Sequence, residues 1–174
     1  MDKPKRIIIG IDPGLRITGY GIIWSQESKQ GCITFGQIKT NSELLNVRLQ
    51  QIHQGLRHVI ATYQPQEVAI EQVFTFHNPQ SALKLGQARG AALVATANQA
   101  LPVAEYSARQ IKQAIVGYGA ATKMQVQHMV RILLQLVKKP LVDAADALAI
   151  ALCHAATQRL SKKLTQIHKR GTRI

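Results

Sequence analysis

Short apolar runs alternate along this chain with longer segments in which apolar residues recur at helical spacing. The run at 7–12 is apolar up to Asp12, and the Pro-Gly pair that follows predicts a strand that ends in a tight turn. Two more segments, 17–24 and 31–40, have strand character and are separated by the polar stretch 25–30. The first forty residues therefore predict three strands joined as an antiparallel meander.

The rest of the chain predicts helices that alternate with short strands. In order, the predicted elements are a helix at 43–63 capped by Asn41 or Ser42, a strand at 67–72, a helix at 79–99, a strand at 102–106, and helices at 107–116, 122–137 and 141–160, with Ser107 and Thr122 as caps. This order predicts an α/β fold, a five-stranded mixed sheet (antiparallel meander plus parallel strands) flanked by helices on both faces. We expect a single domain at 1–160 and a basic, flexible tail at 161–174.

The predicted topology brings two acidic residues together. A helical crossover lets the fourth strand lie parallel to the first. Asp12 and Glu71 then lie at the carboxyl ends of neighbouring strands, where ligands gather in open α/β sheets. The alternative is that Asp12 is an ordinary turn residue and that Glu71 is a solvated strand end.

Composition excludes several classes of protein. The chain has 174 residues, of which 46% are hydrophobic and 18% charged, so it is neither disordered nor too small to bury a core. No apolar run approaches the roughly 20 residues of a membrane helix, and the first run is too short for a signal peptide. Cys32 and Cys153 form no CxxC motif. We expect a soluble cytoplasmic protein without a membrane partner.

Basic residues dominate the charge of the chain. Lys and Arg number 22 against 9 Asp and Glu, and the resulting formal charge of +13 predicts an anionic partner such as nucleic acid. Between Gln72 and Val142 the only acid is Glu105, and after Asp146 there is none. The alternative is an ordinary basic protein, or one associated with the ribosome.

Four of the nine acids adjoin strongly apolar stretches, where unpaired carboxylates are rare: Asp12, Glu71, Asp143 and Asp146. Asp143 and Asp146 are three residues apart near the start of a predicted helix, so they share one face; the alternative is that they are ordinary acids of a helix N-terminus. Four carboxylates in one cleft would form an all-oxygen site that suits Mg²⁺ or Mn²⁺ and not zinc. Two such ions, about 3.5–4 Å apart, would support phosphodiester cleavage.

Five motifs occur in the order and spacing of a known family. They are IGIDPGLRITGYG (9–21), AIEQVF (69–74), SALKLGQARG (81–90), EYSARQIKQAIVGYGAATKMQVQHMV (105–130) and DAADALAIA (143–151). Over residues 7–155 the chain resembles the RuvC-type Holliday junction resolvases. The turn after the first strand is less specific by itself, because RNase H-like and actin-like ATPase families also begin with a glycine-flanked strand and an acid.

This resemblance implies an RNase H-like fold, a homodimer, and Mg²⁺-dependent paired nicking of four-way DNA junctions in recombination and repair, with 5′-phosphate and 3′-hydroxyl ends. It implies that Asp12, Glu71, Asp143 and Asp146 are catalytic metal ligands. We expect two ions per subunit, with Mn²⁺ able to replace Mg²⁺. Some relatives have His where this chain has Asp146. The branch-migration proteins RuvA and RuvB are the implied partners.

Four further residues are candidates for contact with DNA. Lys112 and Lys123 are expected to flank the cleft and to neutralise the scissile phosphate as catalytic and DNA-binding residues, unless they are ordinary solvated lysines. Arg89 either binds a backbone phosphate or lays its stem along apolar surface. Phe74 is expected to stack on a base at the junction centre, with a hydrophobic lid over the core as the alternative. Its neighbour Phe76 has no assigned role.

The predicted helix at 81–99 is rich in small residues, which favours either a dimer face or close packing on its own sheet. Two other functions compete with junction resolution. One is a non-catalytic nucleic-acid-binding module on the same fold, and the other is a related nuclease for RNA or other branched DNA. The presence of all four acids favours an enzyme, because a degenerate site would be expected to have lost one.

Overall fold

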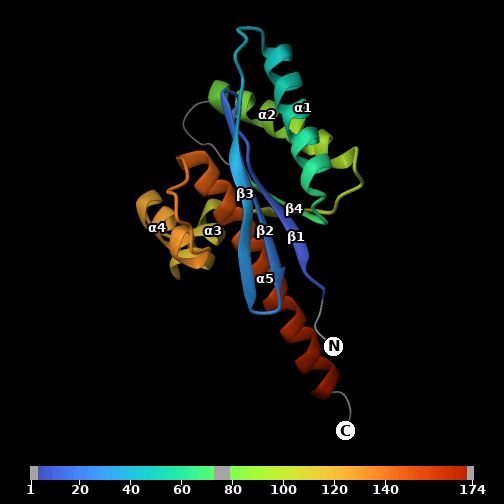
Figure 1. Cartoon of the computed structure of the whole chain (residues 1–174), viewed down its shortest axis with the longest axis vertical. Helices are drawn as coiled ribbons and strands as arrows, with labels where there is room; N and C mark the ends of the chain where they lie inside the picture. The colour runs from blue at the N-terminus through green and yellow to red at the C-terminus, as the bar shows by residue number, and fades with distance from the viewer. Residues whose placement is uncertain (1–3, 73–78, 172–174) are drawn as a thin grey trace.

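The computed structural model describes residues 4–72 and 79–171, and its centre is one five-stranded sheet in the order β3-β2-β1-β4-β5 (Figure 1). The central strand β1 (Arg6–Asp12) pairs antiparallel with β2 (Ile17–Gln26) and parallel with β4 (Glu67–Glu71). β3 (Lys29–Lys39) pairs antiparallel with β2, and β5 (Val103–Tyr106) pairs parallel with β4. The predicted mixed sheet, with its meander and its parallel strands, is confirmed.

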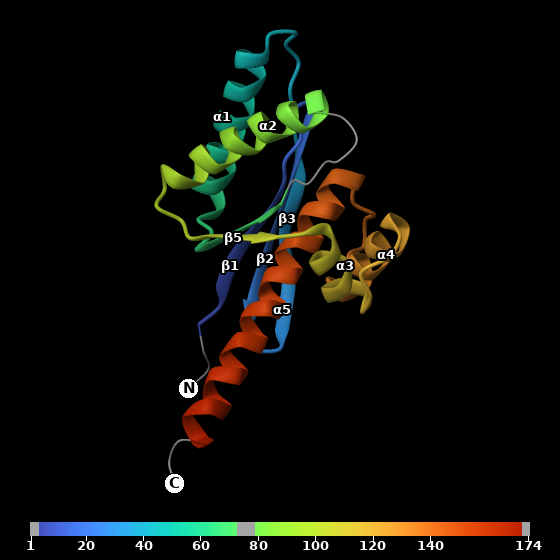
Figure 2. The same cartoon turned by 180° about the vertical axis from the view of Figure 1, so that it is seen from behind.

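Helices cover both faces of this sheet, as predicted (Figures 1 and 2). α1 (Leu45–Tyr63) and α2 (Pro79–Ala97) pack on one face, and α5 (Val142–Gly171) lies across the other. α3 (Ala108–Val116) and α4 (Lys123–Leu133) pack against α5. The sheet is therefore buried on both sides, which explains why its central strands are nearly continuous apolar runs.

Close contact between α5 and the sheet determines where the carboxylates of that helix lie. The side of α5 that meets the sheet includes the small residues Ala147 and Ala151, which face Gly10 of β1. A side chain at Gly10 of β1 would collide with the carbonyl oxygen of Ala147, and one at Gly21 of β2 would collide with Leu148. The glycines of the central strands therefore let the helix backbone approach the strands directly.

The start of α1 differs from the prediction. The cap residue is Leu44, whose side chain makes no cap hydrogen bond, and neither Asn41 nor Ser42 caps the helix. The Asn41 side chain instead accepts a hydrogen bond from Gln51, and the Ser42 hydroxyl accepts one from the backbone of Leu44. Both polar side chains are used in the turn before the helix, which is a common alternative to capping for these residues.

The ends of two other helices also differ. α4 ends at Leu133 and not at 137, because Gln135 has a left-handed backbone (φ 51°) and the Leu136 amide donates to the carbonyl of Arg131. α5 does not end at Leu160 but continues to Gly171, since no proline or glycine interrupts the intervening sequence of good helix formers. The last turns of α5 project beyond the sheet (Figures 1 and 2).

The predicted division into a domain at 1–160 and a flexible tail at 161–174 remains a prediction. The predicted caps of α3 and α4 are confirmed, because Ser107 and Thr122 each form a capping box.

Within the described ranges, no helix has the length and apolarity needed to cross a membrane.

Candidate active site

Two acidic side chains lie at the carboxyl edge of the parallel strands. Ile11 of β1 pairs with Ile70 of β4, so the next residues, Asp12 and Glu71, end neighbouring strands. This arrangement confirms the position that the topology predicted for them. Both side chains contribute to one cavity on the α5 side of the sheet.

The cavity has a volume of about 190 Å³ and collects side chains from five elements. Its lining residues are Asp12, Glu71, Ala108, Ile111, Lys112, Lys123, Val126, Asp146, Ala149 and Ile150. The structure thus brings together three of the four predicted acids and both predicted lysines. The remaining lining residues are apolar, so the charged groups meet in a partly dehydrated space.

Burial and mutual repulsion raise the pKa values of the carboxylates in the cavity. Burial is the largest cause for Asp12, whose pKa is raised to about 8, and the charges of Glu71, Asp146 and Asp143 raise it further. The pKa values of Glu71 and Asp146 are also raised, again chiefly by burial. The site therefore concentrates negative charge that the protein only partly neutralises.

The two lysines supply that partial neutralisation. The ammonium nitrogen of Lys123 lies 3.5 Å from Oδ2 of Asp146, and this charge raises the pKa of the lysine. Lys123 is 75% exposed, so its ammonium group can reach an incoming phosphate. The charge of Lys112 lowers the pKa of Glu71 and so opposes the effect of burial. These positions are suited to phosphate contact.

Asp143 lies beside the cavity and not in its lining. Its Oδ2 accepts a hydrogen bond of 2.6 Å from Nε2 of Gln37 on β3. Its charge nevertheless raises the pKa values of Asp12 and Asp146. Sequence reasoning missed Gln37, although one signal was present. Gln37 follows Phe35 by two residues in a predicted strand, so the two side chains are expected on the same face of the sheet. In the structure Phe35 packs on the α5 side, and Gln37 therefore faces α5 as well.

The chemistry of these donors fits a hard divalent cation. Across the described ranges, no three acidic, histidine or cysteine side chains are close enough to enclose a metal ion by themselves. Mg²⁺ does not require such a cage, because it keeps several waters and binds through one or two carboxylates plus substrate phosphates. Buried oxygen ligands with raised pKa values, of which Asp12 is the clearest, are the groups that such an ion would stabilise.

Arg89, another predicted DNA-contacting residue, makes its polar contacts outside the cavity. Arg89 of α2 forms a 2.7 Å ion pair with Glu105 of β5, and its Nε donates to the backbone carbonyl of Glu71 at 3.3 Å. Arg89 is not among the residues that line the cavity, and its contact with DNA remains a prediction. Phe74 and Phe76 lie outside the described residues.

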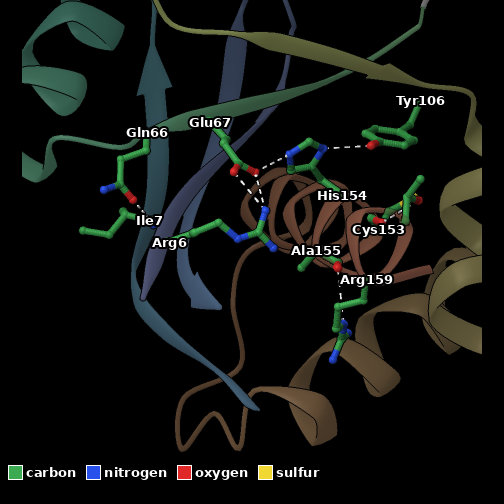
Figure 3. A network of polar contacts seen from close by, with 10 residues as sticks. Arg6, Ile7, Gln66, Glu67, Tyr106, Cys153, His154, Ala155 and Arg159 are labelled. Atoms are coloured by element: carbon green, nitrogen blue, oxygen red, sulfur yellow. Dashed lines mark hydrogen bonds and ion pairs between the residues drawn. The ribbon is translucent and has the colours of Figure 1, made fainter. Parts of the chain in front are cut away.

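A second polar cluster, which we call the His154 network, comprises Arg6, Glu67, His154 and Tyr106 (Figure 3). The Glu67 carboxylate accepts hydrogen bonds from Nη1 of Arg6 at 2.9 Å and from Nε2 of His154 at 2.7 Å. Because a carboxylate only accepts, Nε2 carries the imidazole proton, and Nδ1 accepts from the Tyr106 hydroxyl at 2.7 Å. Each charged or polar group in this network has a partner.

The pKa shifts in the His154 network follow from those contacts. Burial lowers the pKa of His154, and the neighbouring Glu67 carboxylate offsets this only in part. Burial raises the pKa of Glu67, but the hydrogen bonds from His154 and Arg6 outweigh it, so the pKa is lowered overall. At neutral pH the network therefore holds a neutral imidazole and a paired carboxylate.

Comparison with known proteins identifies the family. The family model described as "Crossover junction endodeoxyribonuclease RuvC" matches residues 8–154. The chain belongs to the RuvC family. The family resemblance of the sequence motifs is therefore confirmed, and the chain belongs to a family of nucleases.

Individual RuvC proteins match nearly the whole chain. The Crossover junction endodeoxyribonuclease RuvC of Coxiella burnetii (strain Dugway 5J108-111) is 77% identical over 166 residues, which cover 95% of this chain and 96% of that protein. The Tolumonas auensis protein of the same name is 58% identical over 153 residues, 88% of each chain.

Solved structures agree with this assignment. T. thermophilus RuvC in complex with Holliday junction substrate has a TM-score of 0.84 and 36% identity, covering 90% of this chain and 96% of that one. The yeast mitochondrial Holliday junction resolvase Ydc2 has a TM-score of 0.72 at 14% identity, over 98% of this chain and 86% of that one. At that identity the second match shows a shared fold alone.

Proposed function

We propose that this protein is a Mg²⁺-dependent endonuclease that resolves four-way DNA junctions by paired, symmetric nicking. The observation that carries the proposal is the convergence of Asp12, Glu71 and Asp146 with Lys112 and Lys123 in one cavity. Membership of the RuvC family supports it, as does the match to a RuvC structure that contains a Holliday junction. The formal charge of +13 suits a DNA substrate.

Asp12, Glu71 and Asp146 are the residues that would hold Mg²⁺, with Asp143 beside them. When bound, the ion would supply Lewis-acid activation of water and of the phosphate, and Mn²⁺ or a second ion per subunit would act in the same way. Lys112 and Lys123 would hold the scissile phosphate by charge, and the apolar lining would limit the access of bulk water. Water adds to phosphorus and the P–O3′ bond breaks, leaving a 5′-phosphate and a 3′-hydroxyl.

Paired nicking requires two active sites, and a homodimer would supply them. Part of α2 supports such a face. Ala88 and Ala92 pack inward, whereas apart from the neighbouring backbone of the same helix no atom lies within 4 Å of where a Cβ would stand at Gly86 or Gly90, and Leu83 is exposed. A twofold dimer would match the twofold symmetry of an open junction. RuvA and RuvB as partners, and the cytoplasm as location, belong to the same proposal.

The proposal is tested with labelled immobile four-way junctions of several core sequences and with a matched linear duplex. Wild type and Asp143→Asn are compared in Mg²⁺ and in EDTA. We expect symmetric nicks only in the junctions, only with Mg²⁺ and only with the wild type. Tight binding without cutting across all the junctions would favour a non-catalytic DNA-binding module, and cutting of RNA or of other branched DNA would indicate a different nuclease.

A further inference from the structure

We propose that Gln37 is a positioning residue for the catalytic carboxylate of Asp143, an inference that rests on the function proposed above. Asp143 would be a ligand of Mg²⁺, yet it lies outside the lining of the cavity that the other three acids share. Its carboxylate is instead held by Gln37 from the edge strand β3. We infer that this amide selects the orientation in which the carboxylate can reach the ion.

The sheet register explains how Gln37 on the edge strand β3 reaches Asp143 on the helix α5. Asp12 of β1 pairs with Gly19 of β2, and Gly19 pairs with Gln37 of β3, so the three residues form one row across the sheet. Gly19 has no side chain, and the backbone of Asp143 occupies the space above it. Asp143 therefore sits between Asp12 on one side and Gln37 on the other.

Close packing at Gly19 makes this arrangement specific. A Cβ at Gly19 would collide with the carbonyl oxygen of Asp143 and would lie 3.1 Å from the Cβ of Asp143. The backbone of Asp143 is thus fixed against the sheet, and the remaining freedom is in its side-chain torsions. The hydrogen bond from Gln37 removes that freedom by fixing Oδ2.

The chemistry of the donor distinguishes Gln37 from the lysines. A carboxylate only accepts, so the contact at 2.6 Å comes from the amide nitrogen of Gln37. An amide donor carries no charge, so it orients Asp143 without competing with the cation as an ammonium group would. Hydrogen-bond partners of metal ligands typically change metal affinity by about 10–100-fold when removed. Oδ1 of Asp143 is left for the ion.

Gln37→Met tests this role, because it keeps the length of the side chain and removes the donor. The chain offers a matched control on the same strand. Gln30 of β3 also bonds a residue of α5, accepting from Nη2 of Arg159 at 3.1 Å, at the other end of the strand. Gln30→Met therefore removes a similar contact between strand and helix away from the cavity.

Three quantities are measured for each variant. They are the Mn²⁺ affinity of the protein by electron paramagnetic resonance, the Mg²⁺ concentration for half-maximal cleavage of a four-way junction, and junction affinity in EDTA. For Gln37→Met we expect Mn²⁺ affinity to fall about 10-fold or more and the half-maximal Mg²⁺ concentration to rise by a similar factor. High Mg²⁺ should restore cleavage, and junction affinity should not change.

Gln30→Met should match wild type in all three quantities. Unchanged Mn²⁺ affinity and Mg²⁺ dependence in Gln37→Met would overturn the inference, as would equal shifts in both variants, which would indicate a general effect on packing. Asp143→Asn separates the inference from the proposed function. If Asp143→Asn cuts normally, the assigned site is wrong; if it is inactive while Gln37→Met behaves as wild type, only the role of Gln37 is wrong.

Discussion

The cavity and the His154 network share three elements, β1, β4 and α5, but their charged groups are arranged in opposite ways. β1 contributes Asp12 to the cavity and Arg6 to the network, and β4 contributes Glu71 and Glu67. α5 contributes Asp146 to the cavity and His154, eight residues later, to the network. Eight residues of helix span roughly 12 Å, so the two clusters are separated by only about two turns of α5.

Their difference separates a functional site from a structural one. In the network the Glu67 carboxylate accepts hydrogen bonds from the Arg6 guanidinium group and the His154 imidazole, and its pKa is lowered overall. In the cavity Asp12 is surrounded by other carboxylates, and its pKa is raised to about 8. Polar groups that are fully paired stabilise a fold, whereas carboxylates left close together carry an electrostatic cost that a bound cation can relieve.

Removing a cavity carboxylate is expected to have the largest effect. Asp12→Asn should lower junction cleavage on the order of 10³-fold or more, because it removes a proposed metal ligand. The same change should raise the free energy of unfolding in EDTA at pH 7 by roughly 1–3 kcal/mol, because Asp12 must take up a proton or remain as a buried charge on folding, and Asn requires neither. Cleavage assays and urea unfolding measure the two effects. Unchanged cleavage, or a less stable fold, would contradict the assignment.

The opposite pattern is expected in the His154 network. His154→Leu should lower the free energy of unfolding by about 2–4 kcal/mol, because it removes a hydrogen bond from the buried Tyr106 hydroxyl and weakens the pairing of Glu67. Urea unfolding measures the change, and cleavage at permissive temperature should persist. The control is His58→Leu on the exposed side of α1, which should change stability by less than about 0.5 kcal/mol. Equal effects in the two variants would show that the network contributes nothing specific.

The lysines should have intermediate effects on cleavage. Lys123→Ala and Lys112→Ala should each lower the rate by about 10–100-fold, because each removes one charge from the proposed phosphate site. Single-turnover cleavage at saturating Mg²⁺ measures the loss. Lys139→Ala in the loop after α4 lies outside the cavity lining and serves as the control. A rate for Lys123→Ala equal to that of the control would remove Lys123 from the site.

The cavity and the His154 network should change the stability of the fold in opposite directions as the pH changes. The Asp12 pKa is raised from 3.8 to about 8, so between these values the folded chain retains a proton that the unfolded chain releases. Asp12 therefore favours folding at low pH, and this contribution is lost as the pH rises toward 8. His154 has a lowered pKa, so below about pH 6.5 the unfolded chain takes up a proton that the folded chain does not.

Glu67 acts in the same direction as His154. Its pKa is lowered, so its stabilisation is present above the ordinary value of 4.5 and is lost as the pH falls through the folded value. Urea unfolding from pH 4 to 8 in EDTA measures these changes, and the loss that Asp12 causes as the pH rises should reach several kcal/mol, since each pH unit between 3.8 and about 8 contributes about 1.4 kcal/mol. Asp12→Asn should remove the loss at high pH, and His154→Leu should reduce the loss below pH 6.5. Identical pH profiles for the three proteins would contradict both assignments.

Much of the cavity could be predicted from local sequence. Asp12 and Glu71 each end a short apolar strand, and a helical crossover between strands makes parallel pairing the expected topology. Asp143 and Asp146 follow from helical spacing, and the lysines lie in motifs of the family. These inferences depend on strand ends, helical periodicity and motif order, which are properties of neighbouring residues.

Only the tertiary structure decided the partners of these residues. Gln37 bonds Asp143 across 106 positions of sequence, and His154 bonds Glu67 across 87. Arg89 is a third example, because the sequence did not indicate that it would form an ion pair with Glu105. The sequence by itself determined the strands, the helices and the carboxylates at their ends, because periodicity and turn residues act locally. Which polar groups meet depends on strand register and on the close approach of α5 at the glycines, and these are set by packing of the whole sheet.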